Sequence, residues 1–215
     1  MCYGAEGDLE ETPKVAFEQH KIGNAATLAE KPTDHYSAMM NDATQQNEKT
    51  SSQIAAFDAI MATAYHEAGH AVMALSLGRS IQKVTVSPTR TAHGQSRLGV
   101  CELKKGRSKK SKDAVEDDTL ILLAGMVAEA RFTGSYCHQG ASQDLRYVQS
   151  LLSNRAGNAR QIERLQRRLL DKTEHLLLEP GHAKAIQQIA NELVEKTTIS
   201  GRAARHFYDQ CVASK

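Results

Sequence analysis

Residues 65–71 read YHEAGHA, and this heptapeptide decides how the rest of the chain is interpreted. His66 and His70 are four positions apart, and Glu67 follows the first of them. On an α-helix, residues four apart differ by about 40° around the axis and by about 6 Å along it, so the two imidazoles project from one face. Two imidazoles in this arrangement can bind a single ion. The heptapeptide therefore predicts a helix that carries a metal site.

The residue types of this motif are those of a catalytic zinc site. Neutral imidazole nitrogens bind zinc at about 2.0 to 2.1 Å, and catalytic zinc sites typically have three protein ligands and a water. Glu67 is rotated by about 100° from His66, which sets it apart from the two ligands but near the remaining coordination position. Zinc lowers the pKa of its water toward about 7 and polarises a carbonyl group, so a neighbouring carboxylate can act as the general base of peptide hydrolysis.

The third metal ligand has three candidates downstream, namely Glu129, His138 and Asp144. A metzincin is excluded, because Met73 stands where that class needs glycine and Ser76 where it needs histidine. Carboxylates and imidazoles both bind zinc, so the residues alone leave the choice open.

Apolar periodicity predicts a mainly α fold with a small β-sheet, an α+β class. A stripe with steps of three and four residues indicates one long helix that begins at Ser51 or Ser52, contains the motif and ends near Gly78. Two β-like runs follow at 83–88 and 97–103, and helical patterns occupy 117–132, 141–152, 160–178, 183–195 and 201–212. The expected architecture is a zincin-like HExxH helix, then a short sheet, then a C-terminal helical bundle.

Charge and composition limit the partners and the compartment. Lys and Arg total 27 against 25 Asp and Glu, a balance too even to indicate nucleic acid. Four cysteines lie far apart without a CxxC pair, which argues against a disulfide framework. The N-terminus lacks a secretory pattern, and the longest nearly apolar run, 119–130, is too short to span a bilayer. We therefore expect a soluble, cytoplasmic protein.

Two polar segments stand apart from the helical patterns. Residues 1–50 are rich in polar side chains without a steady apolar period, which predicts a mobile N-terminal arm. Residues 104–112 concentrate basic side chains, as solvated loops commonly do.

Several motifs in order resemble the peptidase domain of the FtsH-type ATP-dependent zinc metalloproteases. They are AYHEAGHAVMALSLG from residue 64, KVTVSP from 83, LGV from 98, LLAGMVAEARFTG from 122 and GASQDL from 140. The resemblance covers about residues 59–205 and implies an FtsH-like zinc metallopeptidase domain at 51–215. It also implies that His66, His70 and Asp144 bind Zn²⁺ and that Glu67 is the catalytic base.

The function implied by this resemblance is a zinc metalloendopeptidase that hydrolyses peptide bonds of flexible or unfolded polypeptides. The sequence contains no GxxxxGK[ST] motif, so no ATPase activity of its own is expected, and either a homo-oligomer or a separate ATPase partner is compatible with it. An extended substrate is expected to add to a strand edge at 84–87 or 98–102. The alternative is a non-proteolytic, metal-containing interaction module that kept the peptidase fold, with the arm and the basic loop binding a partner.

Overall fold

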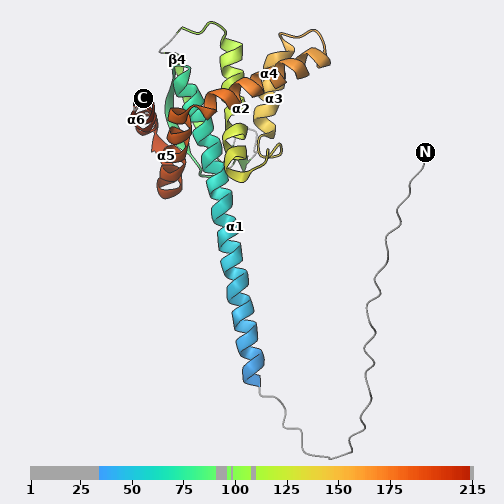
Figure 1. Cartoon of the computed structure of the whole chain (residues 1–215), viewed down its shortest axis with the longest axis vertical. Coiled ribbons are helices and arrows are strands. Elements are labelled where there is room, and N and C mark those ends of the chain that lie inside the picture. The colour runs from blue at the N-terminus through green and yellow to red at the C-terminus, as the bar shows by residue number, and fades with distance from the viewer. Residues whose placement is uncertain (1–33, 91–95, 98, 108–109, 214–215) are drawn as a thin grey trace, which may run out of the picture. The chain divides into compact units, whose positions relative to one another are not determined.

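The computed structural model describes residues 34–90, 96–97, 99–107 and 110–213. Its helices are α1 (Asp34–Ser76), α2 (Ala114–Thr133), α3 (Ser142–Ser153), α4 (Ala159–Leu178), α5 (Pro180–Lys196) and α6 (Gly201–Val212) (Figure 1). Its strands are β1 (Arg79–Thr85), β2 (Thr89–Arg90), β3 (Ser96–Arg97), β4 (Val100–Arg107) and β5 (Thr198–Ser200). The predicted class, mainly α with a small sheet, is confirmed. The elements that form the site lie in the compact unit Gln46–Lys215.

Helix α1 is longer than the sequence pattern predicted. It begins at Asp34, so the expected start at Ser51 or Ser52 is wrong, and both serines lie inside the helix. Residues 34–50 contain neither glycine nor proline and include several Ala, Met and Gln residues. Intrinsic helix propensity therefore continues the helix where the apolar stripe does not. Residues 1–33 of the predicted arm lie outside the described residues, and the division of the chain at residue 50 stays a prediction.

The main sheet is antiparallel and has the strand order β4-β1-β5. Val84 of β1 is paired with Cys101 on one side and with Ile199 on the other. The expectation that a substrate adds to 84–87 is therefore wrong for β1 itself, because this strand is central. Strand β5 was missed in the sequence, since a three-residue strand is too short to display an alternating pattern.

Strand β4 also changes the interpretation of the basic segment 104–112. The strand continues to Arg107, which pairs with Arg79 of β1, so the first part of this segment is strand and not loop. Backbone pairing with β1 does not depend on the side chains, and Lys104 and Lys105 are exposed on the strand.

No helix among the described residues is long and apolar enough to cross a membrane.

The core is centred on the crossing of α1 and α2. The apolar stripe of α1 is buried from Ala64 to Leu75, and α2 is buried along most of its length from Leu120 to Ala128. The two backbones approach closely at Gly69, where a Cβ would lie 2.4 Å from the carbonyl oxygen of Ala124. No side chain fits there without a shift of one helix. Gly69 therefore has a packing role that outweighs its cost of about 1 kcal/mol in helix propensity.

We expect Gly69→Ala to lower the free energy of unfolding by about 1 to 3 kcal/mol, as overpacked core substitutions do. The added methyl group would also meet the Cβ of Ala128 at 2.6 Å. Urea unfolding of the metal-free proteins in EDTA measures the change. Gly157→Ala is the matched control, because its nearest neighbour would be the flexible Gln161 side chain at 3.5 Å. Equal stability of Gly69→Ala and the wild type would contradict this packing role.

Candidate metal centre

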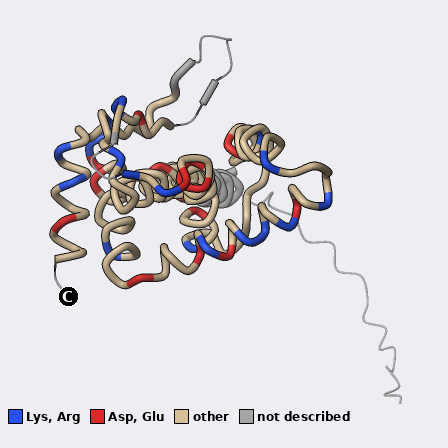
Figure 2. Tube along the Cα trace, turned by 90° about the horizontal axis from the view of Figure 1, so that it is seen from above, with Lys and Arg blue, Asp and Glu red and all other residues tan. Residues whose placement is uncertain are grey.

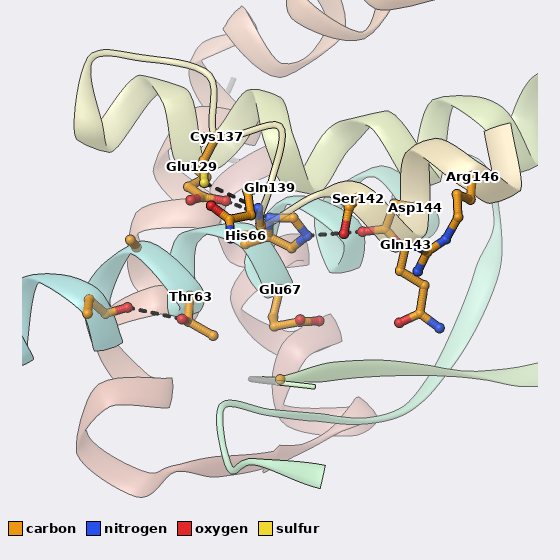
Figure 3. A pocket seen from close by; sticks show the side chains of 14 residues that line it. Thr63, His66, Glu67, Glu129, Cys137, Gln139, Ser142, Gln143, Asp144 and Arg146 are labelled. Atoms are coloured by element: carbon orange, nitrogen blue, oxygen red, sulfur yellow. Dashed lines mark hydrogen bonds and ion pairs between the residues drawn. The ribbon is translucent and has the colours of Figure 1, made fainter. Parts of the chain in front are cut away.

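His66, His70 and Asp144 converge on one buried point. The Oδ2 atom of Asp144 lies 3.2 Å from Nε2 of His66 and 3.3 Å from Nε2 of His70. All three residues are at least nine-tenths buried, with exposed fractions of 7%, 4% and 5%. One ligand atom from each residue lies within 4.8 Å of the others, so the group could hold a metal ion. Figure 3 shows His66 and Asp144 facing each other across this point.

Local structure explains why these side chains meet. His66 and His70 are one turn apart on α1, and their rings lie edge to face with centroids 4.7 Å apart. Asp144 is in the first turn of α3, where the backbone N–H of Leu145 donates to the carbonyl oxygen of Ala141. A short side chain on a helical turn has few conformations, so Asp144 is held toward α1 across 78 positions of sequence.

The outer nitrogen of each histidine is fixed by a partner on α2. Nδ1 of His66 lies 2.8 Å from Oε2 of Glu129, and Nδ1 of His70 lies 2.7 Å from the carbonyl oxygen of Ile121. An Nδ1–H that donates to an oxygen sets the tautomer in which Nε2 carries a lone pair. Both rings therefore direct Nε2 toward Asp144.

These contacts separate the three candidates for the third ligand. Glu129 lies on the outer side of His66, so it orients that ring. His138 is exposed and lies near the ring of Tyr136, with centroids 6.4 Å apart. Only Asp144 of the three faces both Nε2 atoms, and its role as a ligand remains a prediction.

A cation fits this arrangement of atoms. Nε2 of His70 is buried and has no hydrogen bond within the described structure, although it lies close to the carboxylate of Asp144. Two acceptors that face each other in a buried place repel unless a positive charge lies between them. Two imidazoles and a carboxylate are a donor set that zinc accepts.

Gly125 of α2 leaves the room for these rings. A Cβ at this position would lie 2.5 Å from Nε2 of His70 and 2.6 Å from Nε2 of His66. Any side chain here would displace both imidazoles. The sequence did carry a signal for this residue, since a glycine inside an apolar helix often marks a close approach of another part of the chain. The motif alone did not identify the two histidine rings as the groups that approach it.

The side chain of Glu67 extends from α1 toward the start of β4. It is only 3% exposed, and a Cβ at Gly99 would lie 2.8 Å from its Oε1 atom. Glu67 and His66 both line a pocket of about 820 Å³ that also includes Asp144 (Figure 3). The carboxylate is therefore close to the candidate metal ligands and lies on the wall of the same pocket. Gly99 was not recognised in the sequence as part of the site.

The pKa of His66 reflects the carboxylates around it. Burial by itself lowers the pKa of the imidazole, but the hydrogen bonds to Asp144 and Glu129, and then the charge of Glu67, raise it from 6.5 to about 9. His66 is therefore protonated at neutral pH when no cation is bound. The proton supplies positive charge close to where a metal ion would supply it.

We expect the stability of the metal-free protein to fall as the pH rises from about 6.5 to about 9. The pKa of His66 is higher in the folded state, so its contribution is fully present below pH 6.5 and is lost as the pH passes 9. One proton contributes a slope of at most about 1.4 kcal/mol per pH unit. Urea unfolding in EDTA at a series of pH values measures this slope.

His66→Asn should lose this pH dependence, whereas His175→Asn, exposed on α4, should keep it. Zinc added near pH 7.5 should also release a proton in the wild type, because a ligating imidazole must be neutral. A His66 variant with the same slope as the wild type would show that another group causes it.

Comparison with known proteins agrees with the motifs. Residues 53–158 match the model of peptidase family M41, and this range includes His66, Glu67, His70 and Asp144. The ATP-dependent zinc metalloprotease FtsH 2 of Methylacidiphilum infernorum is 41% identical over 86 residues, which are 39% of this chain and 13% of that protein.

Two further relatives are similar over a region of the same size. The ATP-dependent zinc metalloprotease FtsH of Protochlamydia amoebophila is 36% identical over 85 residues, 39% of this chain and 9% of that protein. The protein of the same name from Metamycoplasma arthritidis is 38% identical over 87 residues, 39% of this chain and 11% of that protein. The chain thus spans only 9% to 13% of the lengths of these relatives. The resemblance predicted from the ordered motifs is confirmed: residues 53–158 match the model of peptidase family M41, and part of the chain is similar to the FtsH zinc metalloproteases.

Proposed function

We propose that this chain is a zinc-dependent endopeptidase in which His66, His70 and Asp144 bind the metal and Glu67 is the general base. The observation that carries the proposal is the convergence of the three ligand atoms within 4.8 Å beside a buried carboxylate. Zinc is the metal in the names of the similar proteases, and the donor set suits it.

The proposed mechanism uses Glu67 as a proton carrier. Bound zinc supplies a polarised carbonyl group and a water of lowered pKa. Glu67 takes the proton of the attacking water onto its carboxylate and gives it to the nitrogen of the leaving amine. The rings of His66 and His70 keep their orientation, because Glu129 and the carbonyl oxygen of Ile121 hold their Nδ1 atoms. Orientation by such outer partners keeps the reacting groups in place.

The shape of the site favours a flexible polypeptide as the substrate. The pocket lies at the start of β4, and among the described strands β4 pairs only with β1. The free edge of residues 100–102 is therefore the revised position for an extended substrate, while Leu98 of the predicted edge lies outside the described residues. A segment must be extended to add to this edge, so the proposed substrates are flexible or unfolded segments.

The non-proteolytic module is the weaker alternative. A purely structural metal site needs no general base, yet Glu67 is buried at the pocket wall next to His66. A cytoplasmic location, a homo-oligomer and a separate ATPase partner stay predictions from the sequence.

The metal ligands are tested by His66→Ala, His70→Ala and Asp144→Ala. Each variant should lose at least about 10-fold in zinc affinity and fall to background cleavage of a casein-like unfolded substrate, because the ligand set is incomplete. Zinc content by atomic spectroscopy and cleavage by gel measure the two effects. His175→Ala is the matched control on the exposed surface of α4. Unchanged zinc content in all three variants would refute the assigned ligands.

The general base is tested separately by Glu67→Gln. We expect about one bound zinc per chain and a loss of cleavage of about 10² to 10⁴-fold, since removal of a general base has effects of this size. Glu163→Gln, exposed on α4, should cleave like the wild type. Bound zinc without cleavage in the wild type itself would instead favour the non-proteolytic module.

A further inference from the structure

The two ends of the active-site pocket differ in character. Toward the N-terminal side of His66 on α1, the wall consists of the small residues Ala59, Ala62 and Thr63. At the other end, α3 contributes the polar side chains of Gln143 and Arg146. Figure 3 shows Thr63 and Arg146 on opposite sides of Glu67, with His66 and Asp144 between them. A substrate that crosses the metal group therefore meets an uncharged wall at one end and a guanidinium at the other.

Arg146 is the only lysine or arginine among the residues that line this pocket. It is exposed, and none of the ion pairs between described residues includes it. Basic and acidic residues are interspersed along the helices (Figure 2), and other arginines are paired, such as Arg79 with Asp118 at 2.7 Å and Arg155 with Asp113. No ion pair among the described residues therefore explains why the charge of Arg146 lies at the α3 end of the pocket.

The electrostatics of the pocket give that charge a role. Three carboxylates line the pocket, those of Glu67, Glu129 and Asp144, and their combined charge exceeds that of one bound divalent cation, so the site still repels an acidic group of a substrate. Arg146 opposes this repulsion at the α3 end, and the N-terminal end of α3 adds a partial positive charge of the same sign. A guanidinium also binds a carboxylate through two parallel hydrogen bonds, which an ammonium group cannot do.

We propose that Arg146 is a specificity-determining residue that binds a carboxylate of the substrate at the α3 end of the pocket. The inference rests on the proposed peptidase function and names its substrate class, polypeptides with a carboxylate on one side of the scissile bond. That carboxylate is either the side chain of Asp or Glu or the free C-terminus of a peptide. Both sources present the same planar group, and the peptides used in the test separate them.

The test compares five fluorogenic peptides that differ in charge at one side of the cleavage site. One contains Gln, one Glu and one Lys at the same position, all with amidated C-termini. A fourth contains Gln with a free C-terminus a few residues from the cleavage site, and the fifth is its amidated counterpart of equal length. The wild type should cleave the Glu peptide with a kcat/KM about fivefold above the Gln peptide, the size expected of an exposed ion pair. Preference for the free C-terminus over its amide instead would assign the carboxylate to the chain end.

Arg146→Glu should reverse this order, so that the Lys peptide becomes better than the Glu peptide when the kcat/KM of each is taken relative to that of the Gln peptide for the same variant. Arg146→Lys should keep only part of the preference, because the bidentate geometry is lost. Arg164→Glu is the matched control, since Arg164 is an exposed arginine of α4 that does not line the pocket. It changes the net charge equally and should leave the order of the peptides unchanged.

Binding provides a readout that does not depend on turnover. In the zinc-loaded Glu67→Gln background, fluorescence anisotropy should give a Kd for the preferred carboxylate peptide about fivefold below that of its uncharged counterpart, and Arg146→Glu should abolish the difference. Equal affinities with and without Arg146 would overturn the inference even if cleavage is robust. Selective binding without cleavage by the wild type would support Arg146 and refute the proposed peptidase function.

Discussion

Helices α1 and α2 approach each other backbone to backbone at Gly69, where a Cβ would lie 2.4 Å from the carbonyl oxygen of Ala124. One residue after Ala124, Gly125 lies against the Nε2 atoms of both histidines. The same close crossing therefore packs the core and provides the space for the rings of His66 and His70 in the candidate metal centre. It also brings Glu129 and the carbonyl oxygen of Ile121 within hydrogen-bond distance of the rings, at 2.8 and 2.7 Å. A looser crossing would separate the imidazoles from the groups that orient them.

This crossing buries four ionisable side chains close together. His66, Glu67, His70 and Asp144 are all less than 9% exposed. Buried carboxylates are costly unless hydrogen bonds or opposite charges surround them. The raised pKa of His66 means that a proton provides part of the compensation when no cation is bound. A divalent cation provides more positive charge in the same place, which links metal affinity to the release of that proton.

Features of the site that lie within one segment could be predicted from the sequence, and contacts between segments far apart in the chain could not. The pairing of His66 with His70 follows from the helical repeat within a single segment. Asp144 is 78 positions from His66, and only the family resemblance singled it out from Glu129 and His138. The helix that carries Asp144 was predicted correctly. Periodicity does not say, however, where the preceding loop places the first turn of that helix relative to α1. The start of α1 was wrong for a different reason, because helix propensity extends the helix beyond the apolar stripe that periodicity detects. Strand β5 requires its partner β1 to be recognised, and that pairing joins residues more than 110 positions apart.

The small sheet affects the candidate site because it confines the carboxylate of Glu67 on the side that faces away from the helices. Gly201 at the start of α6 lies against β1, where a Cβ would be 1.9 Å from the carbonyl oxygen of Ile81. Strand β1 in turn sets the register of β4 through the pairing of Val84 with Cys101 and of Thr85 with Val100. Gly99 precedes Val100 directly, so this register determines where the backbone passes the carboxylate of Glu67. The histidines are thus held from α2, while the carboxylate is confined from the sheet. A change at the distant α6 end of the sheet can therefore alter the position of Glu67, the proposed base, without touching the proposed metal ligands.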